Sequence, residues 1–91
     1  MLKERMMINN KENPVQWALL LDELDDAREH LTKLIDEMNK KGETSEVEFG
    51  IYLGHIYLHI NRGWNSRNRT TDLTDEEFEV ESEFPKDIRP V

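Results

Sequence analysis

The stretch WALLLDELDDAREHLTKLIDEM, residues 17–38, decides the fold of this chain. Its apolar residues recur every three or four positions, which is the spacing of one face of an α-helix. Two sets of them repeat at seven-residue intervals and together predict a seam that packs against another helix. The first set is Trp17, Leu24, Leu31 and Met38, and the second, offset set is Leu20, Ala27 and Leu34.

Signals on both sides of this stretch predict a helix over residues 14–41. Asn13 supplies an N-cap side chain, and Pro14 suits the first helical position because its missing N–H needs no partner there. At the other end, Gly42 follows two lysines and tolerates the left-handed conformation in which many helices end. Such a helix spans roughly 42 Å at 1.5 Å per residue.

A second helix is predicted over residues 46–62. Ser45 and Glu48 form a capping box at its start, and Gly63 with the polar residues after it indicates its end. A connection of about four residues brings the two helices back alongside each other in an antiparallel pair. We therefore expect an all-α fold built on a two-helix hairpin.

A short third helix is predicted over residues 75–83. Thr74 and Glu77 form another capping box, and Pro85 stops the helix. A chain of 91 residues is too small for a second domain. The expected organisation is a flexible leader at 1–12, a single helical domain at 13–84 and a flexible tail at 85–91.

The composition excludes several classes of protein. Cysteine is absent, which removes disulfides, thiolate metal sites and cysteine nucleophiles. The 20 acidic residues outnumber the 12 basic ones, for a net charge of −8, so general nucleic-acid binding is not expected. No stretch is apolar enough for a signal peptide or a membrane span. We expect a cytoplasmic protein without a membrane anchor.

The second predicted helix is apolar on two opposite faces when it is projected at 100° per residue. The first helix can cover only one of these faces, because it lies on one side. The face expected to pack against the first helix consists of Phe49, Leu53, Ile56, Ile60 and Trp64.

The other apolar face of this helix needs a different cover. A second copy of the chain would cover it and complete a four-helix bundle, which is the arrangement we expect; the third helix is the alternative cover. Two glycines on this side would allow another backbone to approach closely. The predicted dimer interface consists of Val47, Gly50, Ile51, Gly54 and Leu58.

All three histidines lie on the predicted hairpin. His55 and His59 are one turn apart on the second helix, and His30 of the first helix is level with residue 57, between them. Two imidazoles one turn apart can bind one divalent metal ion, so a metal-binding protein or hydrolase using His30, His55 and His59 is one alternative function. The other interpretation is that these are partly buried polar residues at the edge of the interface, with no cofactor.

An acidic stripe on the first helix supports another alternative. It is either the solvated face of an amphipathic helix or the docking surface of an acidic inhibitor or antitoxin-like protein that binds a basic target. The stripe consists of Asp22, Asp25, Asp26, Glu29 and Asp36.

A basic, aromatic stretch follows the second helix and combines guanidinium groups with an indole plane, the types of group that grip anions or stack on partners. Pairing with the acidic segment 72–87 is the other interpretation. The residues concerned are Arg62, Trp64, Arg67 and Arg69.

No motif in the sequence specifies a reaction or a ligand. We therefore expect a small non-catalytic protein-interaction or regulatory module that acts as a homodimer. A further protein partner is also expected.

Overall fold

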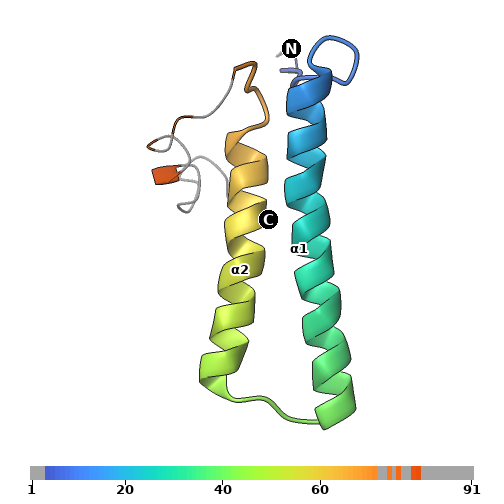
Figure 1. Ribbon diagram of the computed structural model, residues 1–91, viewed down its shortest axis with the longest axis vertical. Coiled ribbons are helices and arrows are strands. Elements are labelled where there is room, and N and C mark those ends of the chain that lie inside the picture. Colours follow the sequence, from blue (N-terminus) through green and yellow to red (C-terminus); the bar gives the residue numbers. More distant parts are fainter. Residues whose placement is uncertain (1–3, 72–73, 75, 77–78, 81–91) are drawn as a thin grey trace.

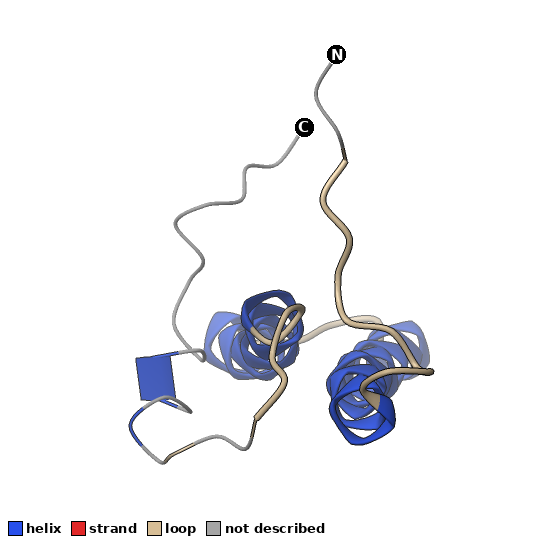
Figure 2. Ribbon diagram, turned by 90° about the horizontal axis from the view of Figure 1, so that it is seen from above, coloured by secondary structure: helices blue, strands red, loops and turns tan. Residues whose placement is uncertain are grey.

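Two long antiparallel helices make up most of the part of the chain that the structure describes. In the computed structural model, α1 (Pro14–Lys41) and α2 (Glu46–Asn65) lie side by side and are joined at one end by a short loop (Figure 1). Seen from above, α1 and α2 lie beside each other in a single layer (Figure 2). The all-α hairpin is thus confirmed. The structure describes residues 4–71, 74, 76 and 79–80, so the predicted helix 75–83 and the tail 85–91 lie outside the described residues apart from those isolated positions.

Helix α1 has the predicted bounds. Gly42 ends it with a left-handed φ of 70°, and the Gly42 N–H donates to the Met38 carbonyl at 2.8 Å. Lys41 in the last turn donates to Glu37, and this hydrogen bond together with the charge of Glu37 raises the pKa of Lys41. The N-terminal cap differs from the prediction, because the Asn13 side chain makes no capping hydrogen bond.

Helix α2 begins as predicted but ends three residues later. The Ser45 hydroxyl oxygen accepts from the Glu48 N–H at 3.0 Å, which is the expected cap. Gly63 does not terminate the helix. A Cβ at this position would lie 3.3 Å from Cδ2 of Leu24, so the glycine allows α2 to approach α1 closely.

The core between the two helices is thin. Ala27 and Leu34 of α1 pack with Ile56 of α2, and Phe49 and Tyr52 cover this cluster as partly buried neighbours. Leu20 continues the line of buried side chains along α1. Among the described residues, only five apolar side chains count as buried, and none of them is completely enclosed.

The predicted seam of α1 is only half correct. The offset set around Ala27 faces α2, but Leu24, Leu31 and Met38 of the first set are between 38 and 47 % exposed. Leu53 and Ile60, expected in the core, are likewise exposed on α2. The physical reason is that one neighbouring helix contacts only a narrow line of side chains, whereas both helices carry apolar stripes wider than that line.

The segment before α1 folds back over the end of the pair. Its Ile8 side chain is buried, and the Ile8 N–H donates to the Arg67 carbonyl at 3.0 Å. This bond joins the segment at residues 4–13 to the chain that leaves α2. Neither described helix is long and apolar enough to span a membrane.

Candidate functional site

The three histidines gather at one edge of the helix pair. The His30 ring stacks on His55 with a centroid distance of 5.5 Å and on His59 with a centroid distance of 5.3 Å, at interplanar angles of 19° and 14°. The predicted register, with His30 between the other two, is therefore confirmed. The result is a column of three nearly parallel imidazole rings that crosses from α2 to α1 and back.

Glu23 holds one end of this column. Its Oε2 lies 2.8 Å from Nδ1 of His59, and its Oε1 lies 3.9 Å from the Arg62 guanidinium. The His59 and Glu23 side chains are 13 % and 23 % exposed, so the contact is largely shielded from water. Glu23 was not singled out in the sequence, although its place one turn from Leu20 and Ala27 put it on the buried line.

The stacking bears on whether the histidines could hold a metal. The lone pair of an imidazole lies in the plane of its ring, so parallel stacked rings direct their lone pairs side by side instead of toward one point. Across residues 4–71, 74, 76 and 79–80, no group of three or more His, Asp or Glu side chains is arranged to hold a metal ion. The metal hypothesis stays a prediction that this geometry does not strengthen.

A larger feature covers the opposite edge of the pair. Eight large apolar side chains, each between 38 and 49 % exposed, form two stripes with a spacing of three and four residues. We call them together the two-helix face. Its members are Leu21, Leu24, Leu31, Ile35 and Met38 of α1 and Leu53, Tyr57 and Ile60 of α2.

The two stripes lie on the same side of the hairpin. On each helix the stripe is rotated by about 70° from the buried line, in the same sense, at 100° per residue. Because the helices are antiparallel, equal rotations in the same sense point to one side of the pair. The histidine column is rotated in the other sense, so the two-helix face and the histidines occupy opposite sides.

The predicted dimer interface lies elsewhere, on the outer side of α2. Val47 and Ile51 are exposed there, and Leu58 is partly buried. A Cβ on Gly50 or Gly54 would meet nothing within 4 Å. Apart from Leu58 this outer face is exposed, and it carries fewer large apolar side chains than the two-helix face. Its role as a dimer interface stays a prediction.

The side chains of the basic, aromatic stretch do not form one exposed cluster, because they contact different parts of the hairpin. Arg67 lies over the Trp64 indole, with its Cζ atom 3.7 Å from the ring centroid, and its guanidinium donates to the Trp64 carbonyl at 2.8 Å. Arg62 points to Glu23 instead. Arg69 is partly buried in the turn after α2. Arg62 and Arg67 thus each contact a residue of the hairpin, and the predicted contact of this stretch with an anion or partner stays a prediction.

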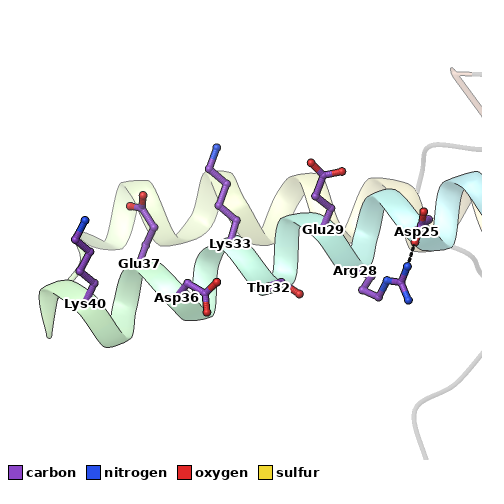
Figure 3. Close-up of a pocket in the computed structure, with 8 residues that line it drawn as sticks. All are labelled: Asp25, Arg28, Glu29, Thr32, Lys33, Asp36, Glu37 and Lys40. Carbon is purple, nitrogen blue, oxygen red and sulfur yellow. Dashed lines mark hydrogen bonds and ion pairs between the residues drawn. The ribbon is translucent and has the colours of Figure 1, made fainter.

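The acidic stripe of α1 is interrupted by cations. Figure 3 shows a shallow depression along α1 in which Arg28, Lys33 and Lys40 alternate with the carboxylates, and Arg28 pairs with Asp25. All of its lining residues come from this one helix. A depression beside a single convex helix cannot enclose a small molecule, and its mixed charges weaken the case for a basic target.

Comparison of the chain with protein-family models, with curated proteins and with solved structures found no match.

Proposed function

We propose that the protein is a non-catalytic protein-interaction module and that the two-helix face is its working surface. The observation that carries this proposal is the imbalance of apolar side chains. Eight large ones are about half exposed on one side of the hairpin, whereas only five are buried among the described residues. Contiguous exposed patches of this kind mark interaction sites in soluble proteins.

Burying this exposed surface would release a large free energy for so small a protein. Burying the remaining half of a large apolar side chain is worth about 1 kcal/mol, so covering all eight is worth roughly 8 kcal/mol. This is comparable to the entire net stability of a typical domain, which is about 5–15 kcal/mol. A partner that covers the face therefore gains a substantial driving force even after association costs of several kcal/mol.

The chemistry of the face suits another protein better than a small substrate. Tyr57 supplies the only oxygen or nitrogen atom among its eight side chains. Binding sites for small molecules combine an enclosed cavity with several convergent polar groups, and the face offers neither. A spacing of three and four residues along two parallel stripes is instead the pattern that receives helices.

The two alternative functions have less support. A metal-dependent hydrolase needs converging ligands, whereas the histidine rings are stacked. An acidic inhibitor needs a surface of one sign, whereas the outer side of α1 alternates in sign. Neither alternative uses the exposed apolar surface, which is the largest unexplained feature of the hairpin.

The proposal is tested in extract of the cells that make the protein. Wild type is expected to elute from a sizing column as a complex larger than one chain, and Ile35→Glu on the two-helix face is expected to elute as a single chain. Leu19→Glu is the matched control, because Leu19 is an exposed leucine of α1 outside this face. Elution of the wild type as a lone 10.8 kDa chain, or equal loss of the complex in both variants, would contradict the proposal.

A further inference from the structure

We propose that the occupant of the two-helix face is a second copy of this chain, with the α1 helices of the two copies packed antiparallel against each other. This inference rests on the proposed function and names the partner of that surface. Four observations carry it: the spacing of the stripes, their lengths, the size of the face and its charge.

The first observation is the spacing of the two stripes. Side chains three and four residues apart on both helices are the knobs of a four-helix bundle, and they need a facing pair of helices with the same spacing. The hairpin itself presents such a pair. A two-fold arrangement is self-complementary, so the same face can serve on both copies.

The lengths of the stripes select the orientation. The α1 stripe runs from Leu21 to Met38, about 26 Å, whereas the α2 stripe runs from Leu53 to Ile60, about 11 Å. Packing α1 on α2 of the second copy would leave much of the long stripe uncovered. When α1 packs on α1 of the second copy and α2 packs on α2, each stripe faces a stripe of its own length.

One two-fold axis satisfies both pairings. The α1 stripe is centred between residues 29 and 30, and the α2 stripe is centred between 56 and 57, which the register of the hairpin places at almost the same height. Gly63 beside Leu24 fixes this register. An antiparallel α1 pair about this centre sets Leu21 opposite Met38, Leu24 opposite Ile35 and Leu31 opposite Arg28. Apolar residues therefore meet in the first two of these layers, and Leu31 meets Arg28 in the third.

The size of the face fits a dimer. Where both helices are present, the face is about 30 Å long and two helices wide, which gives roughly 600 Å² per copy. Two such faces bury about 1,200 Å², the lower end of the range for specific interfaces. A buried core of five apolar side chains is also small for a chain of this length, and small domains often gain stability by oligomerisation.

The charged groups beside the face nearly balance. Arg28 lies within the α1 stripe, at an angle between those of Leu21 and Ile35, and is paired with Asp25 of the same helix. A shallow depression at Leu21 and Leu24 is lined by Arg28 and by two carboxylates, those of Asp22 and Asp25, so this end of the face is weakly acidic. The charge of −8 on the whole chain makes two copies repel each other, so their association is most favourable where the two apolar faces meet.

Light scattering on purified protein tests the occupant. We expect the wild type to have twice the 10.8 kDa of one chain, and we expect Ile35→Glu, which sets a carboxylate opposite Leu24 of the second copy, to weaken the association by at least about 100-fold. Ile51→Glu on the outer face of α2 should leave the mass unchanged. A monomeric wild type, or dissociation caused by Ile51→Glu and not by Ile35→Glu, would overturn the inference. A monomer in pure form that still depends on Ile35 for its complex in extract would leave the proposed function standing.

Cysteine cross-linking tests the orientation, because the chain has no cysteine of its own. The double variant Leu24→Cys/Ile35→Cys should form a disulfide-linked dimer under mild oxidation, since these positions lie opposite each other. Each single variant should stay unlinked, because a copy of the same position is then about 16 Å away along the axis. Linking of a single variant, or a dimeric double variant that does not link, would overturn the antiparallel α1 pair.

Discussion

Leu31 and Leu34 lie one turn apart on α1, yet Leu34 is 4 % exposed and Leu31 is 43 % exposed. Leu34 packs with Ala27 and Ile56 in the core of the hairpin. Leu31 belongs to the stripe that continues across the two-helix face. The difference between these two leucines divides α1 into a line that holds the hairpin together and a line that is available to a partner.

This division predicts different costs for truncating the two leucines. Leu34→Ala should lower the free energy of unfolding by about 2–4 kcal/mol, because it leaves a cavity in a thin core. Leu31→Ala should cost less than about 1 kcal/mol in dilute protein, where no second copy covers the side chain. Chemical denaturation at low protein concentration measures both, and equal costs would contradict the assignment of core and surface.

The contact between Glu23 and His59 should couple α1 to α2. A double-mutant cycle with Glu23→Gln and His59→Ala should give a coupling energy of about 1 kcal/mol, because both side chains are largely shielded. The exposed pair Asp25 and Arg28 is the control and should couple by less than about 0.5 kcal/mol. A Glu23–His59 coupling no larger than that of the control would show that the contact does not hold the helices.

The histidine column should not behave as a metal site. Stoichiometric zinc should leave the melting temperature of the protein unchanged, because stacked rings do not direct their nitrogen lone pairs at one ion. Thermal melts with and without zinc measure this directly. A zinc-dependent rise that is lost in His59→Ala would instead support the metal-binding alternative.

Two glycines of α2 should respond differently to alanine. Gly54→Ala should raise the free energy of unfolding by about 0.5–1 kcal/mol, since the position is helical and a Cβ there meets nothing within 4 Å. Gly63→Ala should raise the free energy of unfolding by less than Gly54→Ala does, or lower it, because the added Cβ would lie 3.3 Å from Cδ2 of Leu24.

Gly54→Ala also distinguishes the two candidate dimer surfaces. It should leave self-association through the two-helix face unchanged. Weaker association in this variant would point to the outer face of α2, where a small residue allows close approach of another backbone.

The sequence contained enough information for the helices and the hairpin. Pro14, Gly42 and the Ser45–Glu48 box are local signals, and they predicted both ends of α1 and the start of α2. Helix α2 extends three residues beyond its predicted end, because glycine often ends helices by adopting the left-handed conformation and Gly63 does not adopt it. Its actual role, close contact with Leu24, depends on tertiary packing.

The surfaces were harder to predict for a physical reason. Both seven-residue sets on α1 are apolar, so hydrophobicity alone cannot tell which set faces α2. The choice is made by the bulky neighbours on α2, Phe49, Tyr52 and Ile56, which pack on the line of Ala27 and Leu34. The histidine cluster was predicted from register alone, but the parallel stacking of its rings depends on side-chain rotamers that the sequence does not specify.

The central claim is that a second copy covers the two-helix face, and methionine oxidation tests it most directly. Met38 lies on that face, whereas Met6 lies outside it and is 82 % exposed. Peptide mass spectrometry after mild peroxide treatment compares the oxidation rates of the two at high and low protein concentration. We predict that Met38 is protected several-fold relative to Met6 in concentrated protein and that dilution removes this protection. If the ratio of the Met38 oxidation rate to the Met6 oxidation rate does not change with protein concentration, the claim is contradicted.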